Sequence, residues 1–121
     1  MIINHLPTYD INIYIGSQER YKGKEFGKYE LMEAIVDYQT LLGTDKACTV
    51  RISRCGYLYQ NYWEKGYQIS TINYCRFPKP VELIEKFMIG LAERLLLKFN
   101  QNRISVVTPN NTIMLSQDDD Q

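Results

Sequence analysis

Apolar positions recur along the chain with two different periods. Residues 11–15 alternate isoleucine with a polar or tyrosine residue, which predicts a strand with one apolar face. Residues 29–42 and 81–99 instead carry apolar side chains three and four positions apart, which is the spacing of an amphipathic helix. Pro80 is compatible with the first turn of the second helix, where no backbone N–H is needed. The pattern therefore predicts one strand and two helices.

Four further segments have the period of two that is typical of strands. Between the first and second of these segments, the run Glu64-Lys65-Gly66 is a turn signal and predicts that the two flanking strands form a long hairpin. The asparagines at positions 110 and 111 predict a turn between the last two strands, because asparagine tolerates left-handed backbone. These segments are residues 46–60, 70–77, 103–107 and 112–115.

The predicted elements follow the order β-α-β-β-α-β-β. Two helices separated by a hairpin indicate an α+β fold, with a mainly antiparallel sheet and both helices packed on one face. We expect an N-terminal extension over residues 1–10, a single α+β ligand-binding domain over residues 11–116, and an acidic polar tail over residues 117–121. The face of the sheet without helices should carry Arg51, Asn73 and some of the ten tyrosines.

Charge and cysteine content exclude several classes of function. Fourteen basic and fourteen acidic residues cancel, so the chain lacks the basic excess that a protein needs to coat polymeric nucleic acid. The three cysteines match no zinc spacing, and no apolar run approaches the roughly 20 residues of a membrane span. We expect a soluble cytoplasmic protein with no metal, no cofactor and no membrane partner.

The double-proline stretch at residues 78–80 places two candidate ligand-binding residues. Pro78 and Pro80 interrupt strand pairing, so Arg76 and Phe77 should lie at the end of a strand. A phenyl ring can stack on a planar base and a guanidinium can bind phosphate oxygens, which suits a phosphorylated ligand. The alternative is structural: Phe77 covers the core beside the helix and Arg76 is a solvated charge.

Arg51 is a third candidate, because it lies between two apolar residues of a predicted strand. It should project rigidly from the open face of the sheet, either into a ligand site or toward a surface acid in an ion pair worth under about 1 kcal/mol.

No catalytic constellation is evident in the sequence. The one histidine, His5, lies near a terminus without a neighbouring acid or cysteine. The acidic residues Glu25, Asp37, Asp45 and Glu64 are all expected in loops or on exposed helix faces. The sequence therefore predicts ligand binding without turnover, and a protein that is not an enzyme.

Short motifs at three places resemble the first family of phage Thoeris anti-defence proteins, the sponges. These are Tyr-Ile-Gly-Ser at the end of the first strand, Ile-Asn-Tyr-x-Arg-Phe-Pro at residues 72–78, and Arg-Ile-Ser-Val-Val-Thr-Pro-x-x-Thr-Ile-Met-Leu at residues 103–115. The resemblance spans roughly residues 11 to 115. It implies a protein that sequesters a cyclic ADP-ribose isomer made by bacterial TIR-domain enzymes, in the cytoplasm of the infected host, and so blocks Thoeris defence.

The resemblance also implies where the ligand binds. In that family the ligand lies in a pocket at a subunit interface, with an aromatic ring against the base and arginines on the phosphates. It implies Phe77 as the stacking ring, Arg51 and Arg103 as phosphate donors, and weaker contacts from Asn73, Thr108 and Pro109; Arg76 is added from its position beside Phe77. Members form dimers or larger homo-oligomers, and some also bind cyclic oligonucleotides.

Two alternative functions remain open at this point. The first is an enzyme that cleaves the same class of signalling nucleotide, although the sequence offers no evident general base. The second is an inhibitor that binds another protein through the aromatic residues of the predicted hairpin, which are Tyr57, Tyr59, Tyr62, Trp63 and Tyr67. The same aromatic cluster also suits an interface between copies of this chain.

Overall fold

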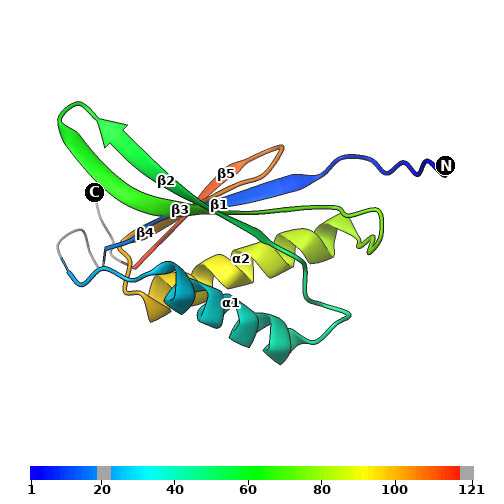
Figure 1. Cartoon of the computed structure of the whole chain (residues 1–121), viewed down its shortest axis with the longest axis horizontal. Coiled ribbons are helices and arrows are strands. Elements are labelled where there is room, and N and C mark those ends of the chain that lie inside the picture. Colours follow the sequence, from blue (N-terminus) through cyan, green and yellow to red (C-terminus); the bar gives the residue numbers. More distant parts are fainter. Residues whose placement is uncertain (19–22, 118–121) are drawn as a thin grey trace.

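The computed structural model describes residues 1–18 and 23–117, and its elements follow the predicted order (Figure 1). The strands are β1 (Asp10–Gly16), β2 (Arg51–Tyr59), β3 (Tyr62–Ile72), β4 (Arg103–Val107) and β5 (Thr112–Ser116), and the helices are α1 (Lys28–Leu42) and α2 (Val81–Lys98). The predicted α+β class and the order of the elements are confirmed.

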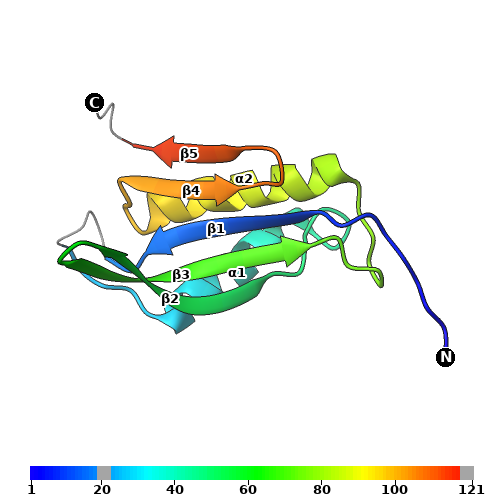
Figure 2. The same cartoon turned by 90° about the horizontal axis from the view of Figure 1, so that it is seen from above.

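The five strands form one antiparallel sheet in the order β2-β3-β1-β4-β5. Figure 1 shows α1 and α2 together on one face of this sheet, and Figure 2 shows both helices behind the strands. The other face carries no helix, and we call it the open face. In the part of the chain that the structure describes, neither helix is long and apolar enough to cross a membrane.

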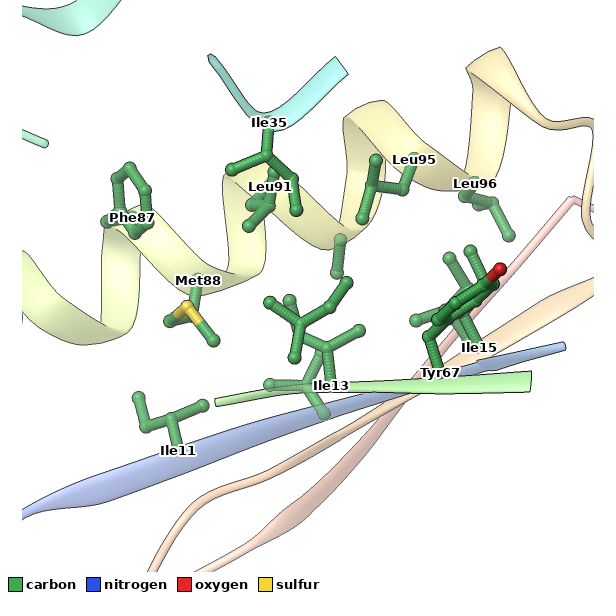
Figure 3. Packing of buried hydrophobic residues seen from close by; sticks show 14 of the residues in the cluster. Ile11, Ile13, Ile15, Ile35, Tyr67, Phe87, Met88, Leu91, Leu95 and Leu96 are labelled. Atoms are coloured by element: carbon green, nitrogen blue, oxygen red, sulfur yellow. The ribbon is translucent and has the colours of Figure 1, made fainter. Parts of the chain in front are cut away.

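The core lies between the sheet and the two helices. Ile11, Ile13 and Ile15 of β1 are at most 1% exposed, because the alternation of a strand directs all three toward the helices. Met88 on α2 is equally enclosed and points toward Ile11, while Phe87, which is 2% exposed, lies on the side of α2 away from the strands (Figure 3). The apolar stripes of the two helices therefore build this core, as their spacing predicts.

The hairpin between β2 and β3 turns four residues earlier than the sequence predicts. Tyr59 pairs with Tyr62, so the turn consists of Gln60 and Asn61, and Gln60 adopts a positive φ of 54°. A two-residue turn of this kind matches the twist of the flanking strands. The prediction of a turn at residues 64–66 is wrong, and Glu64 belongs to β3.

The strand predicted over residues 70–77 also ends earlier, at Ile72. The Asn73 N–H still donates to the carbonyl of Tyr9, but the chain then turns, with the N–H of Phe77 donating to the carbonyl of Tyr74. The side-chain oxygen of Asn73 accepts the Lys79 N–H at 3.0 Å and closes the loop. Arg76 and Phe77 are therefore on a loop after the strand and not at its end.

Candidate functional site

The open face of the sheet is polar along its length. On this face Asn12 accepts a hydrogen bond of 2.8 Å from the side-chain amide of Gln68 on β3. Arg51 pairs with Ser70 in the register of β2 and β3, and Ser105 pairs with Tyr14 in the register of β4 and β1. Because successive residues of a strand point to opposite faces, all of these residues lie opposite the buried isoleucines. The prediction that Arg51 projects from the open face is consistent with this register.

One end of the open face is hollowed into a pocket of about 210 Å³, which we call the open-face pocket. Two glycines leave room for larger side chains here. The ring of Tyr57 on β2 lies across Gly66 of β3, where an added Cβ would come within 2.4 Å of the Ile15 carbonyl oxygen. The Tyr57 hydroxyl donates to the carbonyls of Tyr67 at 3.0 Å and Ile15 at 3.4 Å. Tyr57 therefore bridges three strands and is held rigidly.

The carboxylate of Glu64 lies beside Tyr57, over the second glycine. A Cβ added to Gly16 would come within 2.0 Å of Oε2 of Glu64, so the glycine makes the space that this carboxylate occupies. Burial raises the pKa of Glu64. Burial also raises the pKa of Tyr57, and the neighbouring Cys55 and Glu64 raise it further. An acid and a phenol with perturbed pKa values, adjacent in a pocket, are typical of a functional site.

The expectation that Glu64 lies in a loop or on an exposed helix face is wrong. It pairs with Tyr57 across the β2–β3 ladder and lines the open-face pocket. The sequence carried a signal that could have placed it, because Gln60-Asn61 is also a possible two-residue turn, and a turn there puts Glu64 opposite Tyr57.

Glu64→Gln is expected to raise the melting temperature at about pH 7 and to leave it nearly unchanged at about pH 4. The pKa of Glu64 is raised above its ordinary value of 4.5 in the folded chain. The unfolded chain therefore releases this proton first as pH rises, and stability falls from about pH 4.5 up to the folded pKa. Glu33→Gln, on the exposed side of α1, controls for the lost charge. A Glu64→Gln protein that melts no higher than the parent at neutral pH would contradict this account.

Arg103 also lines the open-face pocket, together with Tyr14 and Ser105. It starts β4, and its neighbour Ile104 is buried against the helices, so the guanidinium is on the open face. The pocket thus combines a carboxyl, a phenol and a guanidinium. Such a set can hold a polar ligand that carries both signs of charge, or an acceptor-rich group such as a phosphate.

Phe77 and Asn73 line a different pocket, of about 260 Å³, which we call the loop pocket. Its lining also includes Lys79, whose ammonium donates to the carbonyls of Thr44 at 3.3 Å and Asp45 at 3.4 Å. Phe77 is 59% exposed, so the alternative that it is buried in the core does not hold. Arg76 lies over its ring, with the guanidinium carbon 5.4 Å from the ring centroid.

Thr108 and Pro109 form the start of the turn between β4 and β5. The Thr108 hydroxyl is buried and is used within the turn, where it accepts the N–H groups of Asn110 and Asn111. Pro109 is exposed beside it.

Within one chain, the predicted ligand residues lie at two ends of the sheet. The register places Arg51 in the same row as Ser70, Asn12 and Val107, so Arg51 is at the end where β4 finishes. The loop of Phe77 follows β3 at this same end (Figure 2). Arg103 is at the opposite end, where β4 begins. The loop pocket and the open-face pocket share no lining residue.

Comparisons with known proteins find the fold but not a family. No family model matches the chain, and no curated protein matches its sequence. Two solved structures share its fold: a phage SAM lyase in complex with S-methyl-5'-thioadenosine, and a phage SAM lyase in the apo state. Each has a TM-score of 0.74 at 13% sequence identity, and the match covers 100% of both chains. The Thoeris sponge family is not shown by these comparisons, so that resemblance stays a prediction.

The expectation that the protein is not an enzyme is contradicted by this likeness, because the proteins that share its fold are named as lyases. The physical source of the error is the misplaced hairpin turn. That turn removed from the sheet Glu64, a carboxyl that the fold places in a pocket beside the phenol of Tyr57.

Proposed function

We propose that this protein binds an adenosine-containing small molecule on the open face of its sheet, and that the ligand is a cyclic ADP-ribose isomer. The observation that carries the proposal is the uncovered polar face, which has Arg103 at one end and Arg51 at the other. Phe77 is on the loop beyond the Arg51 end, where its pocket is lined from the helix layer by Gln39 and Ile84, so it would have to reach the ligand around the edge of the sheet. The ligand named for the structural neighbour, S-methyl-5'-thioadenosine, contains adenosine, as does the ligand class implied by the resemblance.

The proposal includes assembly of two copies of the chain. A twofold axis through the middle of the open face exchanges its two ends, so that Arg103 of one copy lies toward Arg51 and Phe77 of the other. A nucleotide pocket normally encloses at least about 300 Å³. The open-face pocket of one chain has about 210 Å³ and is open on one side, and a second copy would enlarge and close it.

In such an assembly the residues have distinct roles. The guanidinium groups of Arg51 and Arg103 bind the two phosphates, since a planar fork of N–H donors matches phosphate oxygens. Phe77 stacks on the adenine through the face of its ring opposite Arg76, and the side chain is largely exposed in the single chain. Glu64 accepts hydroxyl hydrogens of a ribose.

A second candidate is cleavage of S-adenosylmethionine, which is favoured by the position of Glu64 in a fold shared with a lyase. Formation of S-methyl-5'-thioadenosine requires the bond between the sulfonium sulfur and Cγ to break, with the electron pair going to sulfur. Either a base removes a proton from Cβ and a Cβ=Cγ bond forms, or the substrate's own carboxylate attacks Cγ and closes a lactone. Glu64 can act as that base in the first route, or as the counter-ion of the sulfonium in both.

Mass spectrometry of small molecules separates these candidates. The full chain is incubated with a cyclic ADP-ribose isomer or with S-adenosylmethionine, and the filtrate and the protein fraction are then analysed. Retention of the cyclic nucleotide by the protein supports the first candidate. Production of S-methyl-5'-thioadenosine that is lost in Glu64→Gln supports the second. If neither compound is retained or converted, both candidates are wrong.

A further inference from the structure

A third cavity lies on the opposite side of β3 from the open-face pocket, next to the hairpin. We call it the hairpin pocket, and it has a volume of about 280 Å³. Glu64 lines the open-face pocket, and the next residue, Lys65, lines the hairpin pocket. Because neighbouring residues of a strand point to opposite faces, the two cavities are separated by the sheet itself.

Three cationic side chains line the hairpin pocket. Arg54 pairs with Tyr67 in the β2–β3 register, and Lys65 precedes Tyr67 by two residues, so both lie on the helix side of the sheet. Lys28 is the first residue of α1. One acid, Glu25, lines the same cavity. None of these four residues forms an ion pair with another residue of the described ranges 1–18 and 23–117. Three cations and one acid leave the described lining with a net positive charge, which favours an anion.

The N-terminus of α1 also lies at this pocket, where the carboxylate of Glu30 offsets part of its positive potential. Gly27, the residue before the helix, lines the pocket, and its own N–H is taken by the carboxylate of Glu30 at 2.9 Å. The aligned peptide dipoles of a 15-residue helix place a partial positive charge at this end. Oxyanions bind at helix N-termini for this reason.

Ser17 gives independent support for a bound ligand. It lines the hairpin pocket and is only 4% exposed, and its hydroxyl has no hydrogen-bond partner among the described residues. Both of its backbone groups are hydrogen-bonded: its N–H donates to the carbonyl of Lys65 at 3.0 Å, and its carbonyl accepts the N–H of Phe26 at 2.9 Å. Buried hydroxyl groups are rarely left without a partner, and a donor among three cations suits an oxyanion.

We propose that the hairpin pocket binds an oxyanion of the phosphate class, either inorganic phosphate or the phosphate of a small monoester. Arg54 and Lys65 neutralise its charge, Lys28 and the helix dipole stabilise it from the other side, and the Ser17 hydroxyl donates to one of its oxygens. The site is separate from the proposed nucleotide site and does not depend on it.

Titration of the full chain with sodium phosphate tests this proposal, with sodium chloride added to hold the ionic strength constant. Phosphate is expected to raise the melting temperature more than chloride, because a ligand that binds only the folded chain stabilises it. The double variant Arg54→Gln/Lys65→Gln should bind phosphate on the order of tenfold more weakly by calorimetry, since two charge-assisted contacts are lost. Lys86→Gln, on the exposed side of α2, removes one charge far from the pocket and should bind like the parent.

Ser17→Ala provides a readout that a purely structural role would not give. Its melting temperature without phosphate should equal or exceed that of the parent, because the lost hydroxyl had no partner, while its response to phosphate should shrink. Tighter binding of glycerol phosphate than of inorganic phosphate would assign the natural ligand to a monoester, and equal binding would assign it to the free ion. The proposal is overturned if phosphate stabilises no better than chloride, or if Ser17→Ala and the double variant both respond like the parent.

Discussion

Replacing Arg103 with alanine is expected to weaken ligand binding by about 2 to 5 kcal/mol, roughly 30-fold to 5,000-fold in Kd. The effect is large because the guanidinium lies in a pocket and, in the proposed assembly, loses contact with water when the ligand binds. Removing it leaves a buried phosphate, or the carboxylate of S-adenosylmethionine, without its partner. Calorimetry with the ligand that the protein retains measures the change.

Two further variants make this test specific. Arg103→Lys keeps the charge but loses the planar fork, so its Kd should fall between those of the parent and Arg103→Ala. Arg94→Ala removes the same group from the helix layer, where the guanidinium carbon lies 5.8 Å from the Tyr38 ring centroid, and should bind ligand normally. If Arg103→Ala binds as tightly as Arg94→Ala, Arg103 does not contact the ligand.

Replacing Phe87 with alanine is expected to lower the free energy of unfolding by about 3 to 5 kcal/mol. Its ring is 2% exposed, lies on the side of α2 that faces away from the sheet, and packs against the ring of Tyr38 on α1 with centroids 5.3 Å apart. The variant loses both the transfer free energy of the ring and the contacts around the cavity that remains. For a domain whose total stability is about 5 to 15 kcal/mol, this is a large fraction.

Urea unfolding followed by circular dichroism measures this loss, and the same helix provides the control. Leu97 is 62% exposed, so Leu97→Ala should change the free energy of unfolding by no more than about 0.5 kcal/mol. The urea concentration at the unfolding midpoint should fall for Phe87→Ala. The slope of the unfolding free energy against urea concentration should be similar for both variants. Equal midpoints for the two variants would show that the core does not lie where Figure 3 places it.

The elements were predictable because their signals are local. The alternation of Ile11, Ile13 and Ile15 marks one buried face, and the structure buries all three. The spacing along α2 likewise predicted a helix, which runs from Val81 to Lys98. Both signals depend only on side chains within a few residues of each other, and the packing of the two helices on the sheet follows from them.

The site was less predictable because it depends on register. Glu64 enters the open-face pocket only if the hairpin turns at Gln60-Asn61, and the competing signal at Glu64-Lys65-Gly66 gave a turn four residues later. A shift of that size changes which residues pair and removes Glu64 from the sheet altogether.

The site was also hard to predict because it depends on pairing between strands that are far apart in the sequence. The separation of Arg51 and Arg103 follows from the ladders that join β2 to β3, β3 to β1 and β1 to β4. No local pattern encodes these three registers together, so the sequence could name the two arginines without locating them relative to each other. The loop of Phe77 is a similar case, because its shape depends on the hydrogen bond between Asn73 and Lys79.

Native mass spectrometry of the full chain, mixed with a cyclic ADP-ribose isomer and S-adenosylmethionine together, tests most directly whether copies of this chain build an adenosine site on their open faces. The account predicts an assembly with an even number of chains that carries an adenosine-containing molecule, and loss of that molecule in Arg103→Ala. A spectrum of single chains carrying neither the nucleotide nor S-methyl-5'-thioadenosine would contradict it.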